Sequence, residues 1–432
     1  MGKVVIIGAG LAGLTCAKVL KQGGWQDLLL LEKSDGPGGR VCTDRVEGFR
    51  LDRGFQVLFT AYPGVQRHLN LSALNLRRYR PGAVLVKGGR LFLLGDPLRD
   101  PASGIPSLLN PLASWQDKLR ILQLRAQLAR RSSEQVFRQG LGGEDTSIRQ
   151  FLQRYGFSAA ICEHFLYPFY RGILLDPDLD SSACLFAFYF KMMAEGPVVT
   201  PALGMGEIAR QLAGHLLPEQ VRYQTTVEQI LVQGGKVRGI RTRAGEEIAA
   251  EWVICATDAL QARAWQQTLL KQVSVPIPTQ GRAVTCLYFS APFSLTRGGY
   301  IHLNANGRGW INNWVELTQV SPQLAPAGQH LYSVVVLGDP PLAEEELVQA
   351  CRQELQVVFP KAPLQQLQLV RMYRIPFAQF VQPPGFQVHL PTAFSGIQGL
   401  LWAGEYTHQS SIEGSLRSGE QAAEWVLKSR GA

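Results

Sequence analysis

The first forty residues alternate between short apolar runs and polar turns. Residues 4–7 and 28–31 consist only of Val, Ile and Leu, which is typical of strands covered on both faces in a parallel sheet. Residues 11–22, between these runs, carry Leu, Ala and Val in a pattern that predicts a helix. The order strand, turn, helix, strand predicts the start of a Rossmann-type α/β domain.

The turn after the first strand holds three spaced glycines, Gly8, Gly10 and Gly13. In a dinucleotide site the first allows a tight turn, the second lets backbone amides approach a pyrophosphate, and the third lets the helix lie close to the strand. Glu32, nineteen residues after Gly13, ends the second strand, where a carboxylate accepts hydrogen bonds from both ribose hydroxyls. We expect the adjacent Ala12 and Lys33 to belong to the same site.

A second glycine-rich turn, Gly38-Gly39-Arg40, begins six residues after Glu32. A nicotinamide cofactor does not need such a turn. In this respect the sequence resembles the flavin-containing amine oxidoreductase superfamily, which places a Gly-Gly-Arg turn against the pyrophosphate and the flavin of FAD. The resemblance implies that the cofactor is FAD.

Residues 51–59 alternate like a strand, and Pro63 with Gly64 marks a turn into a helix. The stretch LDRGFQVLFTAYPG resembles the corresponding segment of the plant-type phytoene and zeta-carotene desaturases within this superfamily. The resemblance implies that the backbone at Gly54 and Phe55 lies against the flavin ring.

The closing segment predicts a strand that ends at Gly404-Glu405 and a helix that begins at Ser411-Ile412-Glu413. Ser411 is a suitable N-cap, and the free amides and positive dipole end of such a helix stabilise negative charge on a flavin that is being reduced. The residues of this closing segment again resemble those of the plant-type desaturases. The resemblance implies that Glu405 binds the ribityl or pyrophosphate part of FAD.

Two residues from the middle of the chain complete the site that the resemblance implies. Val227 corresponds to the residue that meets the adenine through its backbone, and Ala256, at the end of a buried strand, borders the same place. The expected fold is therefore a Rossmann-type FAD-binding domain, discontinuous in sequence, with a second α+β substrate domain, as in amine oxidases and phytoene desaturases. The expected bounds are 1–80, 200–270 and 385–432 for the first and 81–199 and 271–384 for the second.

The predicted second domain contains segments that admit two interpretations. Residues 113–139 have a helical pattern with basic residues on several sides, which favours a helix packed on two sides over one that faces lipid. The aromatic helix through residues 186–193 is either core or the wall of a tunnel for a long apolar substrate. Sheet aromatics are more often core than cavity lining; these are Tyr300, Trp310, Trp314 and Tyr332. Phe377 is the expected aromatic near the flavin, and His408 is expected to be an exposed loop residue.

Composition excludes some classes of protein. The chain has 432 residues, 46% hydrophobic and 18% charged, as expected for a globular protein of two domains. The formal charge of +9 comes from scattered residues without a nucleic-acid motif, so we expect no nucleic-acid partner, whereas an anionic membrane surface stays open. Seven widely spaced cysteines favour a reduced, cytoplasmic protein without a metal site. No apolar run is long enough to span a membrane, so any membrane contact is expected to be peripheral.

The expected activity is FAD-dependent removal of hydride from an organic substrate. The sequence contains no Ser-His-Asp set, HExxH motif or carboxylate pair that would identify a catalytic side chain. The resemblance implies an apolar isoprenoid such as a carotenoid precursor, reached from a membrane surface, with a quinone or oxygen as electron acceptor. The alternatives are a soluble amine oxidase or porphyrinogen-type oxidase, and a non-catalytic binder of prenylated or lipid partners. FAD is expected to be non-covalent because the closing segment lacks a cysteine.

Overall fold

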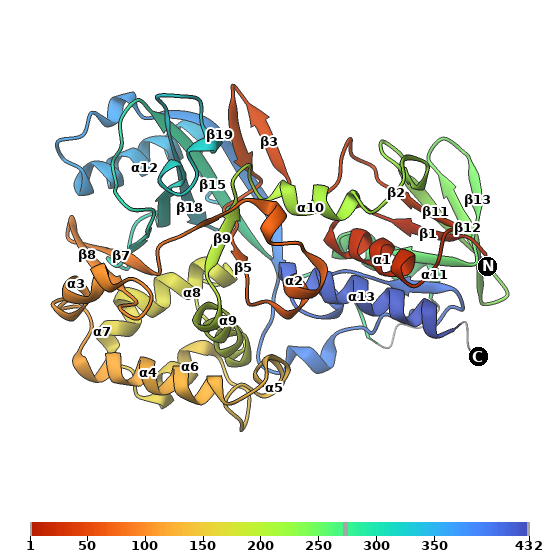
Figure 1. Ribbon diagram of the computed structural model, residues 1–432, viewed down its shortest axis with the longest axis horizontal. Helices are drawn as coiled ribbons and strands as arrows, with labels where there is room; N and C mark the ends of the chain where they lie inside the picture. The colour runs from red at the N-terminus through yellow and green to blue at the C-terminus, as the bar shows by residue number, and fades with distance from the viewer. Residues whose placement is uncertain (1, 271–274, 430–432) are drawn as a thin grey trace.

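A five-stranded parallel sheet forms the right-hand part of the molecule in Figure 1. The computed structural model describes residues 2–270 and 275–429. The strand order is β10 (Val221–Arg222), β2 (Leu28–Leu31), β1 (Val4–Ile7), β14 (Trp252–Cys255) and β20 (Leu400–Trp402). Every neighbouring pair is parallel. The predicted Rossmann-type sheet is therefore confirmed, with strands from the beginning, middle and end of the chain.

Two helices from opposite ends of the chain cover this sheet side by side (Figure 1), α1 (Leu11–Gln22) and α13 (Ile412–Lys428). A Cβ atom on Gly419 of α13 would lie 2.1 Å from the carbonyl oxygen of Ala12. Only glycine permits this close approach, which packs the middle of α13 against the start of α1.

A seven-stranded sheet forms the second part of the molecule. Its order is β19 (Gln368–Phe380), β15 (Gly281–Ala291), β18 (His330–Leu337), β17 (Ile311–Glu316), β16 (Ile301–Asn304), β7 (Gly82–Lys87) and β8 (Arg90–Gly95). All pairs are antiparallel except β16 with β7. Helix α12 (Glu344–Val358) packs on this sheet at the upper left of Figure 1, and α8 (Tyr167–Leu174) contacts β17.

The strands of the two sheets come from different parts of the chain. The parallel sheet takes its strands from residues 1–80, 200–270 and 385–432, whereas the seven-stranded sheet takes its strands from 81–199 and 271–384. On this ground we propose the same division into two domains that the sequence predicts.

A layer of helices lies below the second sheet in Figure 1. It comprises α3 (Gly104–Leu108), α4 (Trp115–Ala129), α5 (Ser133–Gln139), α6 (Ile148–Tyr155), α7 (Ala159–Ile161), α8 and α9 (Ala183–Glu195). The remaining α-helices and strands lie outside the two large sheets and this helical layer. These are α2 (Pro63–His68), α10 (Gly206–Ala213), α11 (Ala259–Leu269), β3 (Thr43–Val46), β4 (Phe49–Asp52), β5 (Leu58–Phe59), β6 (Leu76–Arg78), β9 (Val198–Pro201), β11 (Val227–Gln233), β12 (Lys236–Thr242) and β13 (Glu247–Ala249). Their strands form three small sheets, β11-β12-β13, β3-β4 and β5-β9-β6.

The prediction of one helix over residues 113–139 that packs on two sides is wrong. Ser114 and Ser132 each form an N-terminal capping box, so the segment divides into α4 and α5. On α4 only one apolar stripe is covered, with Leu124 and Leu128 buried. The other stripe, Trp115, Leu119, Leu122, Ala126 and Ala129, is exposed.

Candidate cofactor and substrate site

One cavity of about 1670 Å³ extends between the parallel sheet and the second sheet. All of the predicted cofactor residues except Gly13 and Glu413 line it. The residues that the structure brings together here are Gly8, Gly10, Ala12, Glu32, Lys33, Gly38, Gly39, Arg40, Gly54, Phe55, Val227, Ala256, Gly404, Glu405, Ser411 and Ile412. Residues predicted from separate stretches of the sequence therefore surround a common space.

The glycine turn after β1 leaves open space where a phosphate could lie. Gly8 has φ +107°, a conformation that favours glycine. A Cβ on Gly10 would have no atom within 4 Å, whereas a Cβ on Gly13 would lie 2.0 Å from the Gly8 carbonyl oxygen. Gly10 caps α1 without a side-chain hydrogen bond, so the amides of the first turn of α1 lack a side-chain cap. Gly13 acts through helix packing and does not contact the cavity.

The second glycine turn lies directly against the first. The Gly38 amide donates to the Ala9 carbonyl at 2.8 Å, and Gly10 and Gly38 form a parallel bridge. Gly38 and Gly39 both have positive φ, +128° and +60°. This geometry places Arg40 at the cavity beside the start of α1.

Glu32 lies at the end of β2 and is buried. One carboxylate oxygen accepts the Ala9 amide at 2.7 Å, and the other accepts the amide and hydroxyl of Ser34 at 2.9 and 2.6 Å. A carboxylate has about four acceptor positions, and these three bonds leave capacity for one ribose hydroxyl. The arrangement fits a contact with one ribose hydroxyl rather than the predicted two, and it also fixes the glycine turn.

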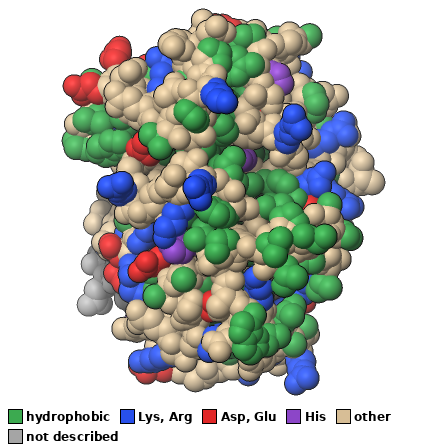
Figure 2. Space-filling model, turned by 90° about the vertical axis from the view of Figure 1, so that its left-hand side faces the viewer, with side chains coloured by type: hydrophobic (Ala, Val, Ile, Leu, Met, Phe, Trp, Pro, Cys, Tyr) green, Lys and Arg blue, Asp and Glu red, His purple; other side chains and the backbone are tan. Residues whose placement is uncertain are grey.

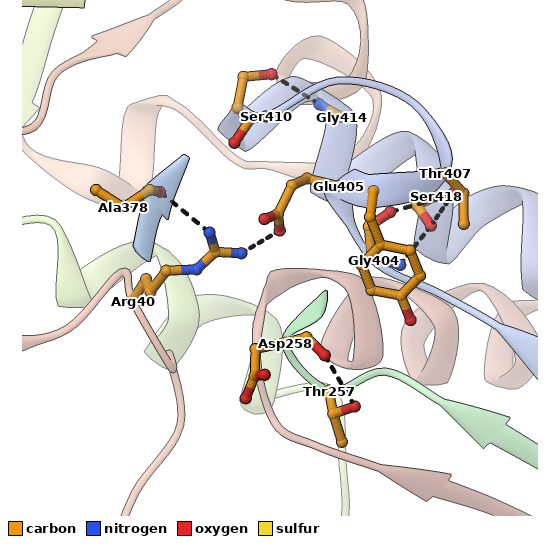
Figure 3. A network of polar contacts seen from close by, with 12 residues as sticks. Arg40, Thr257, Asp258, Ala378, Gly404, Glu405, Thr407, Ser410, Gly414 and Ser418 are labelled. Carbon is orange, nitrogen blue, oxygen red and sulfur yellow. Dashed lines mark hydrogen bonds and ion pairs between the residues drawn. The ribbon is translucent and has the colours of Figure 1, made fainter. Parts of the chain in front are cut away.

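Arg40 and Glu405, which both line the cavity, form an ion pair (Figure 3). Arg40 also donates to the Ala378 carbonyl of β19 at 3.1 Å. The other oxygen of Glu405, Oε1, is buried and has no hydrogen-bond partner among the described residues. A buried acceptor without a donor is unfavourable unless a ligand satisfies it. This orphan oxygen therefore fits a hydroxyl-bearing ligand such as the ribityl chain of FAD.

The start of α13 faces the same cavity. Ser411 is the N-cap, as predicted, and its hydroxyl accepts the Gly414 amide at 3.0 Å. The Gly404 amide donates to Ser418 Oγ at 2.7 Å, which holds the end of β20 against α13 (Figure 3). The positive end of the α13 dipole is thus directed at the cavity beside Glu405.

The sequence predicts that Glu413 belongs to the cofactor site, but the structure places its side chain outside the cavity. Its carboxylate is buried between α13 and α2 and accepts the Gly64 amide with both oxygens, at 2.8 and 3.0 Å. It is not among the residues that line the cavity.

The remaining part of the cavity is mainly apolar. Helix α9 contributes Tyr189, Phe190 and Met193, while its Phe186 and Met192 are buried in the core. The aromatic helix therefore contributes both to the core and to the lining of the cavity, and its role as the wall of a substrate tunnel stays a prediction. Helix α8 and the segment before it add further aromatic lining, namely Phe165, Phe169 and Tyr170.

The interpretation of the sheet aromatics as core holds for three of them. Tyr300, Trp314 and Tyr332 are buried and do not line the cavity, and Trp314 stacks on His302 at 5.1 Å. Trp310 is 40% exposed and is neither core nor cavity lining.

Phe377, the aromatic expected near the flavin, does not line the cavity. Phe377 packs against Gly281, and its neighbours Ile375, Ala378 and Gln379 line the cavity instead. The register between β15 and β19 shifts at this point, so the strand bulges and re-aims its side chains.

His408 is not an exposed loop residue. Its ring stacks on Phe137 at 4.7 Å, and burial with the nearby Arg417 lowers the pKa of His408 to about 3. A histidine that stays neutral in this position serves packing and does not exchange protons near neutral pH.

Sequence reasoning missed Gln379. The Gln379 amide nitrogen donates to the Ile173 carbonyl at 2.8 Å, while its oxygen is buried without a partner in the described part of the chain. A bulge in β19 brings Gln379 to the cavity, and no residue spacing indicates it in advance.

No group of His, Cys, Asp or Glu within residues 2–270 and 275–429 could hold a metal ion. In the same residues no helix is long and apolar enough to cross a bilayer. All seven cysteines are unpaired, and none lines the cavity.

Comparison with known proteins agrees with this geometry. The chain is 23% identical over 471 residues to the 15-cis-phytoene desaturase of Solanum lycopersicum, covering 99% of this chain and 78% of that protein. It is 28% identical over 293 residues to the hydroxyneurosporene desaturase of Rubrivivax gelatinosus, covering 58% of this chain and 52% of that protein. A solved structure of putrescine oxidase bound to putrescine has the same fold, with a TM-score of 0.70 at 16% identity over 99% of both chains.

The sequence model of one family spans nearly the whole chain, matching residues 11–427. Its members are described as flavin-containing amine oxidoreductases. Together with a cavity whose glycine turns, buried acid and helix start fit FAD, this match shows that the chain is an FAD-dependent oxidoreductase of the flavin-containing amine oxidoreductase family.

Proposed function

We propose that this protein removes hydrogen from an apolar isoprenoid of the carotenoid-precursor type, which it takes from a membrane surface. The observation that carries the proposal is that one cavity joins the FAD residues to an aromatic chamber formed by α8 and α9. Pockets for small ligands usually measure roughly 300–1,000 Å³, so about 1670 Å³ accommodates a dinucleotide and a second large ligand. The similarity to two proteins named as carotenoid desaturases supports this substrate class.

FAD, when bound, supplies the hydride acceptor. The protein's own groups bind and orient the substrate and the cofactor and stabilise the charge that forms. The α13 N-terminus favours negative charge at the end of the cavity that it faces. Aromatic side chains such as Phe169 and Tyr189 hold an apolar chain and exclude water from it. We infer that a quinone or oxygen reoxidises the cofactor. We also infer that FAD is held without a covalent bond, so acid precipitation should leave a colourless pellet and a yellow supernatant.

An exposed apolar surface surrounds one end of the cavity. We name it the α3–α4 patch. It consists of Leu98, Ile105, Leu108, Leu109, Trp115, Leu119 and Leu122, whose exposures range from 50% to 73%. Figure 2 shows hydrophobic side chains gathered on this face of the molecule with Lys and Arg around them.

The α3–α4 patch fits a lipid bilayer. Leu98, Leu108 and Leu122 belong to the patch and also line the cavity, so the cavity opens where the apolar surface is exposed. Lys118 and Arg130 lie on or directly after α4, as expected for contact with anionic headgroups. A membrane contact here would let an apolar substrate pass from the bilayer into the cavity without crossing water.

Product analysis tests the substrate class. The purified FAD enzyme is incubated with a carotenoid precursor in liposomes and a quinone, and separately with putrescine and with a porphyrinogen under oxygen. We expect a product with one more conjugated double bond, seen as absorbance at longer wavelength, from the liposome reaction alone. Peroxide release with an amine, or oxidation of the porphyrinogen, without any polyene product would replace the proposal with the corresponding oxidase.

A further inference from the structure

Glu413 is a buried carboxyl group close to the cofactor cavity but outside its lining. It is the second residue of α13, directly after Ile412, which lines the cavity. Its side chain is about 1% exposed, and the Gly64 amide is its hydrogen-bond donor at both oxygens. Such a site shields the carboxylate from water while a single N–H group stabilises its charge.

The cations near Glu413 form ion pairs with other acids. On α13, Arg417 pairs with Glu134 at 2.8 Å, and from α2, Arg67 pairs with Glu420 at 2.6 Å. Tyr62 and Glu420 are further titratable groups near Glu413, and burial strongly raises the pKa of the Tyr62 hydroxyl. Burial, together with the negative charge of Glu420 and opposed by the Gly64 hydrogen bond, Arg417 and Arg67, raises the pKa of Glu413 to about 7.

We propose that Glu413 takes up a proton when the bound FAD is reduced, and so compensates the negative charge that reduction brings to the start of α13. A hydride carries two electrons and one proton to FAD, which leaves the site with one additional negative charge. The Glu413 carboxylate then binds one proton from solvent and becomes a neutral carboxyl group. Two electrons and two protons have entered, and the site returns to its initial charge.

The coupling follows from burial and proximity. Charges separated by protein interior interact far more strongly than exposed charges, because little water lies between them. Negative charge at the α13 N-terminus therefore favours the protonated form of Glu413 over its carboxylate. By reciprocity, a proton on Glu413 makes FAD easier to reduce.

The coupling has a defined pH window. At about pH 5 Glu413 is already protonated in both redox states, so it contributes no uptake. At about pH 7 it is half ionised before reduction, and from about pH 8 upwards it is largely ionised before reduction and becomes protonated on reduction. Additional proton uptake is therefore expected on the alkaline side of neutrality and not in acid.

Proton uptake on reduction tests the proposal without any substrate. The FAD-loaded wild type, Glu413→Gln and Glu424→Gln are reduced anaerobically by a redox dye in weak buffer with a pH indicator. Glu424 lies on the same helix, is exposed and pairs with Lys428, so its substitution is the matched control. At about pH 8, Glu413→Gln should take up fewer protons per FAD than wild type, by up to one, while Glu424→Gln should match wild type.

Two further measurements keep the test decisive. Above neutrality, the FAD midpoint potential of Glu413→Gln should depend less on pH than that of wild type. Infrared difference spectra of the wild-type apoprotein should show the Glu413 carboxyl group losing its proton near neutral pH. Should Glu413→Gln not bind FAD, Glu413→Asp retains the carboxyl group and should retain the uptake. Equal uptake and equal pH dependence in Glu413→Gln and wild type would overturn the proposal. Because no substrate enters these assays, they give the same answer whether or not the substrate class is right.

Discussion

Arg40 and Glu405 form an ion pair although 365 residues separate them in the chain. Arg40 follows the second glycine turn, and Glu405 follows β20. Arg40 also donates to Ala378 in the seven-stranded sheet. One guanidinium group thus connects segments from the beginning and the end of the chain with the second sheet, at the lining of the cavity (Figure 3).

Replacing Arg40 should weaken both the fold and FAD binding. Arg40→Met leaves the buried Glu405 carboxylate without its cation, and because Arg40 is itself 39% exposed we expect a loss of about 2 kcal/mol in the free energy of unfolding. Urea unfolding of the apoprotein measures this, and calorimetric titration measures FAD affinity. The double variant Arg40→Met/Glu405→Gln removes both charges of the ion pair. Its loss in free energy of unfolding should therefore be smaller than the sum of the losses in the two single variants. Strict additivity would show that the two residues do not interact.

Gly10 and Gly13 should respond differently to the same substitution. A Cβ on Gly10 enters open space, so Gly10→Ala should fold with wild-type stability but bind FAD at least tenfold more weakly, because the methyl group occupies the place where a pyrophosphate would lie. A Cβ on Gly13 meets the Gly8 carbonyl oxygen at 2.0 Å, so Gly13→Ala should lower the melting temperature of the apoprotein. Wild-type FAD affinity in Gly10→Ala would place the pyrophosphate elsewhere.

The stability of the apoprotein should depend on pH through Glu413. Because burial raises the folded-state pKa of Glu413 to about 7, its contribution is present below the ordinary glutamate pKa and is lost as pH rises through about 7. A shift of this size corresponds to about 3 kcal/mol. Glu413→Gln cannot ionise, so it should be more stable than wild type at about pH 8 and similar at about pH 4. Denaturant unfolding across this range measures the difference, and parallel curves for the two proteins would contradict it.

Membrane binding should depend on the α3–α4 patch. Leu108→Glu/Leu109→Glu places two charges on its most exposed part and should reduce co-sedimentation with anionic vesicles at least tenfold. Val357→Glu, an equally exposed apolar position on α12, is the matched control and should bind like wild type. Binding of wild type should also weaken with salt and with zwitterionic vesicles, because Lys118 and Arg130 contribute electrostatically. If neither the double substitution nor the lipid charge changes binding, the patch has another role.

Both ends of the chain can be predicted from sequence because local rules determine them. Gly8 and Gly38 need positive φ, and Ser411 caps a helix through its own side chain, so these roles depend on neighbours in the chain. The position of the Glu413 carboxylate depends on a hydrogen bond from Gly64, which is 349 residues away. The exposure of Leu119 depends on which elements pack against α4. A bulge in β19 turns Phe377 away from the cavity and brings Gln379 to it. These features arise from tertiary packing, which residue spacing does not encode.

Anaerobic mixing of the FAD-loaded protein with a carotenoid precursor in anionic liposomes tests the central claim most directly. If the cavity brings an apolar isoprenoid from the bilayer to FAD, the flavin absorbance should bleach in a single turnover. The bleaching should slow in Leu108→Glu/Leu109→Glu but not in Val357→Glu. Flavin that stays oxidised with the polyene and bleaches with a water-soluble amine would contradict the account.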